Sequence, residues 1–338
     1  MRIRYIVAIL VSFFFMLPNC SEASAGSISP PPNEAQVERL VQEATDLHSR
    51  LPSFTPSLAS LSTAAGVYEA QGSSLSLNCD PARSQALVQT PEPCWLGDEG
   101  SKKVVVLVGD SNAGNWSPAL SLALQQLHYK LAVFVYPGCP SQFVKLTEQN
   151  PNSGVTYQDC NLFHTKVQSV IEALDPKAII STELGNQSSG DTPTFLPYAE
   201  NWKRTFDLLT TKRPHTIRIL IGTTPLNDTQ SIPICLSRYI SSSTNAGMAA
   251  CSPNYYPGVT SSTNLWSYWQ RDKLSATISG AKLIQTYKWF CGFQSTVMDY
   301  CPAVIGGNLV YVDQDHTSID YMDTLQTVLR IALVDAGL

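Results

Sequence analysis

Short runs of aliphatic residues recur along the chain from residue 104 onwards, and turn-forming or polar residues follow each run. The longest unbroken run is Val104-Val105-Val106-Leu107-Val108. A continuous apolar run of this length is typical of a parallel strand that is buried on both faces. Four later apolar segments also predict strands: 131–136, 177–182, 217–222 and 309–312. This pattern predicts an open α/β sheet, in which ligands bind beyond the carboxyl ends of the strands.

Two polar motifs stand directly after apolar runs. The first run ends in residues 109–111 (Gly-Asp-Ser), and the last ends in residues 313–316 (Asp-Gln-Asp-His). Serine is a weak nucleophile until a histidine accepts its proton, and that histidine works best when a carboxylate holds its other nitrogen. Either motif alone is a common turn. Their order and their places at strand ends favour a catalytic triad of Ser111, Asp313 and His316.

These motifs resemble the SGNH/GDSL hydrolase superfamily over residues 100–338. Within it the chain is most similar to the extracytoplasmic SGNH domains that bacterial membrane O-acyltransferases carry. Those domains have a Gly-Cys-Pro element, matched by residues 138–140, and a later cysteine that opens a helix, matched by Cys160. The resemblance implies a three-layer, flavodoxin-like α/β fold with a central parallel sheet and helices on both faces. It also favours Asp313 over Asp315, the alternative, as the residue that orients the histidine.

In this superfamily three hydrogen-bond donors form an oxyanion hole, which is a large electrostatic contribution to acyl transfer. The resemblance assigns these donors to the backbone N–H groups of Ser111 and Gly138 and to the side chain of Asn186. The match is incomplete, because Gly185 directly precedes Asn186 where the superfamily has Gly-x-Asn-Asp. The alternative is that Asn186 is a loop amide bonded to the backbone. Asn112 stands where the acyltransferase domains have histidine, a departure that concerns substrate handling.

The residues after His316 predict how that histidine is held. Residues 317–320 have the form of a capping box with Thr317 at the N-cap, and a final helix is predicted through Tyr321 to about Val334. The histidine then lies on a loop ahead of a helix. The other histidines are predicted to be structural or on the surface, and no metal site is expected, because none has a second ligand at metal-binding spacing. They are His48, His128, His164 and His215.

The N-terminus predicts export. Two arginines precede an apolar segment over residues 5–17, and residues 23–25 (Ala-Ser-Ala) predict a signal peptide over residues 1–25. The apolar segment is shorter than the ~20 residues of a membrane span. A retained signal anchor and a lipid-modified Cys20 are the alternatives. The mature protein is predicted to be extracytoplasmic, either secreted or associated with the cell envelope.

The chain divides by composition into two parts after the signal peptide. Residues 26–99 predict an N-terminal appendage with Pro/Ser-rich linkers and one polar helix over residues 33–51. Residues 100–338 are the predicted catalytic domain.

The cysteines agree with an oxidising compartment. The chain has nine, and removal of Cys20 with the signal peptide leaves an even number. Pairing of nearest neighbours, one of many possible connectivities, predicts four disulfide bonds. These join Cys79 to Cys94, Cys139 to Cys160, Cys235 to Cys251, and Cys291 to Cys301. The second of these bonds would brace the loop that carries Gly138.

Composition limits the partners. The 338 residues are 43% hydrophobic, which is enough to bury a full core. A net charge of −5 without a basic run argues against nucleic acid and anionic lipid. Only 14% of the residues are charged, which suits a surface exposed to carbohydrate and equally an ordinary solvated surface. We expect no cofactor, a substrate that is an O-acylated glycan or a small ester, and a separate membrane acyltransferase as a candidate acyl donor.

Together these features predict an exported serine esterase or O-acyltransferase that acts on O-acyl groups, chiefly O-acetyl groups, of envelope carbohydrate. The reaction would pass through an acyl-enzyme on Ser111. Water as the acceptor makes the protein an esterase, whereas a sugar hydroxyl makes it an acetyltransferase, and both reactions use the same residues. The alternative is a catalytically silent module of the same fold that binds envelope glycan or a membrane acyltransferase. The complete triad argues against that alternative.

Overall fold

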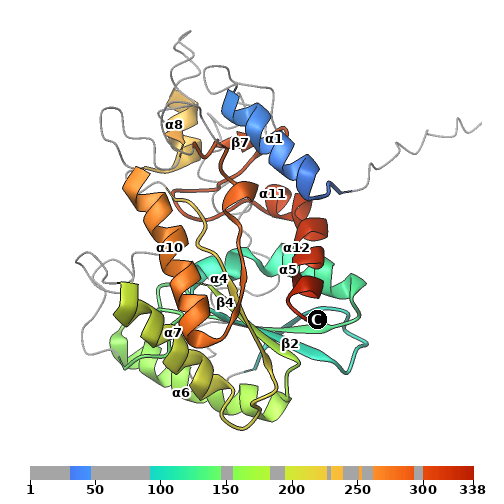
Figure 1. Ribbon diagram of the computed structural model, residues 1–338, viewed down its shortest axis with the longest axis vertical. Coiled ribbons are helices and arrows are strands. Elements are labelled where there is room, and N and C mark those ends of the chain that lie inside the picture. Colours follow the sequence, from blue (N-terminus) through green and yellow to red (C-terminus); the bar gives the residue numbers. More distant parts are fainter. Residues whose placement is uncertain are drawn as a thin grey trace, which may run out of the picture. The chain divides into compact units, whose positions relative to one another are not determined.

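The computed structural model describes residues 31–46, 92–145, 155–182, 195–226, 230–238, 251–252, 262–292 and 300–338. Its centre is a six-stranded sheet (Figure 1). The strands are β1 (Cys94–Gly97), β2 (Val104–Gly109), β3 (Lys130–Val135), β4 (Ala178–Thr182), β5 (Ile217–Ile221) and β6 (Lys282–Ile284). Across the sheet the order is β1-β3-β2-β4-β5-β6, with β1 antiparallel to β3 and all other neighbours parallel. The parallel strands have the flavodoxin-like order, and the direction of crossover reverses between β2 and β4.

Four of the predicted strands are confirmed to within one residue, but the prediction for residues 309–312 is wrong. Only Asn308–Leu309 of that region is a strand (β8), and it pairs with Val304–Ile305 (β7) outside the main sheet. The N–H groups of Val310 and Val312 bond to the carbonyls of Ala303 and His316, so this buried segment pairs locally. The last strand of the main sheet is β6, which is too short for an apolar run to reveal it.

Alternate residues of the strands point to opposite faces of the sheet, and each face is buried under its own helices. On one face Val105 and Leu107 belong to a large hydrophobic cluster to which several helices contribute. They include α1 (Glu34–Asp46), α5 (Ser117–Gln126), α11 (Ile319–Thr324) and α12 (Gln326–Asp335). On the other face Val106 and Val108 pack in a second cluster with three helices. These are α6 (Tyr157–Leu174), α7 (Phe195–Leu209) and α10 (Ser262–Ser279). Burial on both faces explains why β2 is apolar at every position.

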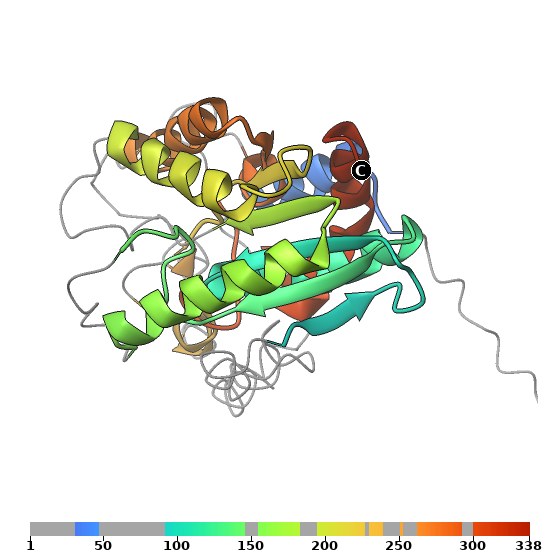
Figure 2. The ribbon, with the colours of Figure 1, turned by 90° about the horizontal axis from the view of Figure 1, so that it is seen from below.

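The figures show this layering directly. In Figure 1, α6, α7 and α10 gather on one side of the sheet, and α5 and α12 lie on the other. Figure 2 shows β1 at one edge of the sheet and α10 near the opposite edge. The three-layer α/β fold is therefore as predicted, with the addition of an antiparallel edge strand.

Helix α1 packs on the same core as the sheet. Val37 and Val41 are buried in the first cluster, and Glu38 forms an ion pair with Lys288 at 3.2 Å. Both α1 and the edge strand β1 precede residue 100, and residues Pro31–Leu338 form one compact unit. The core thus uses residues on both sides of the boundary that composition suggests.

The segment after His316 differs in detail from the prediction. The N-cap of α11 is Ser318, whose Oγ accepts the N–H of Tyr321 at 3.2 Å. The cap is thus one residue later than the predicted Thr317, which forms a β-bridge with Tyr311. The single helix that was expected is two helices, since Leu325 ends α11 and α12 begins directly after it.

Three disulfide bonds lie within the described residues and agree with the predicted pairs. They join Cys139 to Cys160, Cys235 to Cys251, and Cys291 to Cys301. Cys94 is also disulfide-bonded, whereas its expected partner Cys79 lies outside the described residues, as do Cys20 and the predicted signal peptide. Such bonds are typical of proteins outside the cytoplasm. Among the helices in the described ranges, none is both long and apolar enough to cross a membrane.

Candidate active site

Ser111 stands at the turn from β2 into α4 (Ser111–Asn115), at the carboxyl edge of the sheet. Asp110 is the N-cap of this helix, and its Oδ1 accepts the N–H of Asn112 at 2.9 Å. Gly109 has a φ of +156°, and a Cβ at this position would collide with Ser141 Oγ. The tripeptide therefore combines a backbone that requires glycine with a cap that starts the helix at the serine. Ser111 is buried at this turn, with an exposed fraction of 6%.

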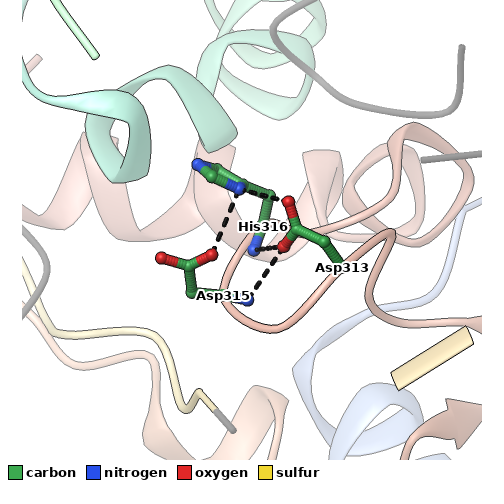
Figure 3. Close-up of side chains that lie close together, drawn as sticks. All are labelled: Asp313, Asp315 and His316. Atoms are coloured by element: carbon green, nitrogen blue, oxygen red, sulfur yellow. Dashed lines mark hydrogen bonds and ion pairs between the residues drawn. The ribbon is translucent and has the colours of Figure 1, made fainter. Parts of the chain in front are cut away.

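His316 lies on the loop before α11, where its ring faces Asp313 (Figure 3). The distance between His316 Nδ1 and Asp313 Oδ2 is 2.6 Å. The other oxygen, Oδ1, accepts the backbone N–H groups of Asp315 and His316 at 2.9 and 2.7 Å. The carboxylate is thus fixed by the backbone of its own loop. With Nδ1–H donated to Asp313, Nε2 is the basic nitrogen of the ring.

Asp315 is a second carboxylate at the same ring nitrogen. Its Oδ1 lies 3.2 Å from His316 Nδ1, and Figure 3 shows the two carboxylates on either side of that atom. The contact with Asp313 is shorter, and only Asp313 also binds the loop backbone through its side chain. The geometry therefore favours Asp313 as the residue that orients the histidine.

The charges around His316 favour its protonated form. Burial opposes protonation, but the hydrogen bond to Asp313 and the negative charges of Asp313, Asp315 and Asp110 outweigh burial and raise the pKa of His316 to about 9. Burial also opposes ionisation of Asp313, yet the hydrogen bond to His316 holds the pKa of that carboxyl below its ordinary value. Burial and the charge of Asp313 raise the pKa of Asp315 to about 6, although the charge of His316 opposes the rise. The site stabilises an imidazolium ion.

The segments that carry Ser111 and His316 contact each other. Asn115 of α4 points its Nδ2 at the backbone carbonyl of Asp315 at 3.4 Å, and the charge of Asp110 acts on His316. His316 Nε2 is buried and has no hydrogen-bond partner among the residues that the structure describes, so it is not bonded to Ser111 in this state. Nε2 is therefore the ring nitrogen that remains for proton exchange at this edge of the sheet, because Nδ1 is held by Asp313.

The loop after β3 carries Gly138, the second predicted oxyanion donor. Gly138 has a φ of +77°, a conformation that favours glycine. The next residue, Cys139, is bonded to Cys160 in α6. His164, further along α6, has its Nε2 2.9 Å from the carbonyl of Pro140. Burial lowers the pKa of His164 to about 4, against the effect of this hydrogen bond, so the ring is neutral and Nε2–H donates. The loop is therefore anchored to α6 at two points.

Of the remaining predicted residues, the structure describes His128, His215 and Asn112. Asn186 and His48 lie outside the described residues. His128 is on the surface, where its Nδ1 lies 3.2 Å from Asp98, and His215 is exposed. Asn112 is buried beside Ser111, with its Oδ1 3.4 Å from the side-chain nitrogen of Asn115 and its Nδ2 unpaired within the described part of the chain.

Ser141 also lies at this site, although no motif in the sequence predicts it. Its Oγ accepts the N–H of Asp110 at 2.9 Å and donates to the carbonyl of Thr182 at 2.6 Å. These partners are 31 and 41 positions away in the sequence. Sequence motifs relate residues a few positions apart, so they do not predict contacts between residues this far apart in the chain.

Asp313, Asp315 and His316 are the one group in the described ranges that brings three metal-ligand atoms within 4.8 Å of one another. The Nδ1 that would bind a cation already donates to Asp313. The group thus has the form of a histidine held by carboxylates.

The sheet order, the serine at the end of β2 and the carboxylate-held histidine are features of an SGNH-type α/β domain. The family described as "SGNH domain (fused to AT3 domains)" matches residues 78–330, and the chain belongs to this family.

Two solved structures are similar to this chain, and the first of them shares its fold. The periplasmic domain of a lipopolysaccharide acetyltransferase from Salmonella ser. Paratyphi A is 15% identical, with a TM-score of 0.54 over 78% of this chain and 100% of that one. A carbohydrate esterase family 2 enzyme plus carbohydrate binding domain from Corynascus thermopiles (Myceliophthora fergusii) is 12% identical, with a TM-score of 0.39 over 70% of this chain and 66% of that one. Comparison with curated protein sequences found no match. The family supports an acyl-transfer or hydrolase enzyme without deciding between the two.

Proposed function

We propose that the protein is an extracytoplasmic serine enzyme that transfers or hydrolyses O-acyl groups, chiefly O-acetyl groups, of envelope carbohydrate. The observation that carries this proposal is the state of His316. Its Nδ1 is held by Asp313 at 2.6 Å, and its Nε2 is buried and unpaired among the described residues, at the sheet edge where Ser111 lies. A histidine in this state is oriented to remove a proton from a serine hydroxyl.

The reaction would proceed in two halves. In the first, His316 Nε2 takes the Ser111 proton while Oγ attacks the ester carbonyl, and the tetrahedral intermediate then expels the alcohol, which takes the proton from Nε2. In the second, Nε2 takes a proton from water or a sugar hydroxyl, whose oxygen attacks the acyl-enzyme. Ser111 leaves with the proton returned from Nε2. The carboxylates beside Nδ1 stabilise the imidazolium ion that each half requires.

The developing oxyanion needs donors that are in place before the reaction. We assign the backbone N–H groups of Ser111 and Gly138 to this role, with the side chain of Asn186 as a third donor. The cap on α4 supports the first assignment, because the Asp110 side chain accepts the N–H groups of Asn112 and Ala113 and not that of Ser111. The left-handed backbone at Gly138, braced by the adjacent disulfide bond, supports the second.

Carbohydrate is the proposed substrate class for two reasons. The Salmonella domain that shares the fold belongs to a lipopolysaccharide acetyltransferase, and the surface of this chain is weakly charged, with 14% charged residues overall. An acetyltransferase would receive its acyl group from a separate membrane acyltransferase or from a small ester. An esterase would pass the group to water with the same residues.

The second candidate is a silent module that binds envelope glycan or a membrane acyltransferase. The absence of a bond between Ser111 and His316 Nε2 in this state favours it. Catalytic hydrogen bonds are often formed only when substrate binds, however. The missing bond is therefore weaker support for a silent module than the Asp313–His316 contact is for an enzyme.

Turnover of p-nitrophenyl acetate by the purified protein distinguishes the serine enzyme from the silent binding module. Wild type should release p-nitrophenol, Ser111→Ala should not, and a soluble oligosaccharide should become O-acetylated if transfer competes with hydrolysis. Equal release by wild type and Ser111→Ala, or none from a folded wild type, would contradict the enzymatic proposal and favour the binding module.

A further inference from the structure

The structure assigns Ser141 as a positioning residue that fixes the Ser111 turn and the Gly138 loop relative to each other, so that their backbone N–H groups form one oxyanion hole. This inference rests on the proposed function. It concerns the buried hydroxyl that joins the ends of three strands.

The Ser141 hydroxyl both accepts and donates a hydrogen bond. The Oγ accepts the N–H of Asp110 at 2.9 Å and donates to the carbonyl of Thr182 at 2.6 Å, and the side chain has no exposed surface. A hydroxyl has a single hydrogen, so its donation to Thr182 fixes the direction from which Asp110 is bonded. Both partners are backbone groups, which side-chain rotation cannot move.

The topology explains what this bond joins. Ser141 follows β3, Asp110 follows β2, and Thr182 is the last residue of β4. Since β2 lies between β3 and β4, the loop after β3 crosses over the end of β2 to reach β4. The crossing lies where the order of the strands reverses, which is the place where open α/β sheets bind their ligands.

Ser141 lies so close to Gly109 that the loop after β3 and the Ser111 turn constrain each other. The missing side chain of Gly109 makes room for Ser141 Oγ, because a Cβ at Gly109 would collide with it. The N–H of Tyr136 bonds to the carbonyl of Gly109 at 2.9 Å, so the start of the loop is also joined to the turn. The peptide that follows Asp110 carries the N–H of Ser111, and its orientation therefore depends on how Asp110 is held.

Other contacts hold the Gly138 loop to the fold independently of Ser141. Cys139 is bonded to Cys160, the carbonyl of Pro140 accepts from His164, and the N–H of Phe143 donates to Thr205 Oγ1 at 2.7 Å. Loss of the Ser141 hydroxyl should thus leave the loop in place and free only its alignment with the Ser111 turn. A positional error of this kind impairs the transition state more than substrate binding.

The test compares Ser141→Ala with Ser181→Ala. Ser181 is a matched control: it is also fully buried, and its Oγ donates to the carbonyl of Val108 at 2.6 Å, which is a group of β2 and not of Asp110 or the loop. With p-nitrophenyl acetate we expect kcat of Ser141→Ala to fall at least tenfold with KM within twofold of wild type. Binding of phenylboronic acid, which forms a tetrahedral adduct on serine, should weaken by a similar factor. Ser181→Ala should stay within twofold of wild type in each measurement.

Other results would overturn the assignment. If Ser141→Ala matches Ser181→Ala, or if its KM and kcat change while boronate affinity does not, Ser141 has a structural role only. If Ser141→Ala does not fold, Ser141→Cys, which keeps a weak donor and acceptor, takes its place. Its kcat should be lower than that of wild type with KM unchanged, and a wild-type kcat would contradict the inference. If the wild type shows no Ser111-dependent turnover, the proposed function is wrong. This outcome is distinguishable from failure of the Ser141 assignment, because it is seen before any Ser141 variant is made.

Discussion

At the scale of single residues, His316 is the group on which the proposed chemistry depends, because its two ring nitrogens have different surroundings. Nδ1 is enclosed by Asp313 and Asp315, whereas Nε2 has no partner in the described residues. Three carboxylates, those of Asp313, Asp315 and Asp110, act on one imidazole. The site is therefore built to hold a positive charge on the ring during the reaction.

The two carboxylates beside Nδ1 should differ in importance. We predict that Asp313→Asn lowers kcat by roughly 10³ to 10⁴, because the amide no longer holds the reactive tautomer. Asp315→Asn should lower kcat by less than about tenfold, since it removes a negative charge but leaves the shorter bond between His316 and Asp313 in place. Steady-state rates with p-nitrophenyl acetate, beside thermal melts that show both variants folded, check this. A larger loss for Asp315→Asn would reverse the assignment.

The raised pKa of His316 predicts an alkaline pH dependence. The ring must be neutral to accept a proton, so kcat/KM should rise with pH and level off above about 9. Asp315→Asn should move this midpoint to lower pH, because it removes one of the charges that raise the pKa. The stabilising effect of the protonated ring has the opposite dependence: it is complete below 6.5 and lost as pH rises through about 9. A midpoint near 6.5 in the wild type would contradict the arrangement.

Part of the site was readable from the sequence. Residues three apart, such as Asp313 and His316, meet through local backbone, so their spacing predicts the contact. Ser141 could not be predicted in the same way, because its partners are on other strands and a lone serine after proline is ordinary in loops. Asn186 stays a prediction, since it lies outside the described residues.

At the scale of elements, the loop after β3 and helix α6 act as one unit. The Cys139–Cys160 bond and the hydrogen bond from His164 to Pro140 join them. Tyr136 and Ser141, which lie on either side of Gly138 in the sequence, bond to the residues at the end of β2. The sequence predicted the bond from the order of the cysteines, but it gave no sign that His164 faces the same loop.

Removal of this disulfide bond should affect both stability and rate. For the double variant Cys139→Ser, Cys160→Ser we predict a loss of about 3 kcal/mol in the free energy of unfolding and about a tenfold loss in kcat. The matched control is Cys291→Ser, Cys301→Ser, which should lose stability but keep kcat within twofold. Urea denaturation and steady-state kinetics measure the two effects. An unchanged kcat in the first variant would show that the loop does not depend on the bond.

Strand prediction succeeded where both faces are buried and failed where burial has another cause. β2 to β5 are covered by helices on each side, so their sequences are apolar and easily recognised. Residues 309–312 are just as buried, but their backbone bonds go to local partners such as Ala303 and His316. Burial alone does not distinguish a strand of the main sheet from a buried connecting segment.

At the scale of the whole molecule, the core extends beyond the SGNH sheet to α1. Val37 and Val41 of α1 join the cluster under α11 and α12. The polar composition around this helix suggested an appendage, because only a narrow stripe of it is apolar. The packing shows that a narrow stripe suffices to attach a helix to a large core.

This packing predicts that α1 contributes to global stability. Val41→Asp, which buries an unpaired charge, should lower the free energy of unfolding by about 4 kcal/mol. Glu38→Ala, which removes only the exposed ion pair with Lys288, should cost less than about 1 kcal/mol. Urea denaturation of the full chain compares them. Similar values for the two variants would mean that α1 is not part of the cooperative core.

The central claim is that Ser111 carries the acyl group. The most direct measurement is the intact mass of the protein after brief exposure to p-nitrophenyl acetate and acid quenching, followed by mapping of the modified peptide. We predict one added acetyl group on Ser111 in the wild type and none in Ser111→Ala. An acetyl group at another residue, or turnover that persists in Ser111→Ala, would contradict the claim.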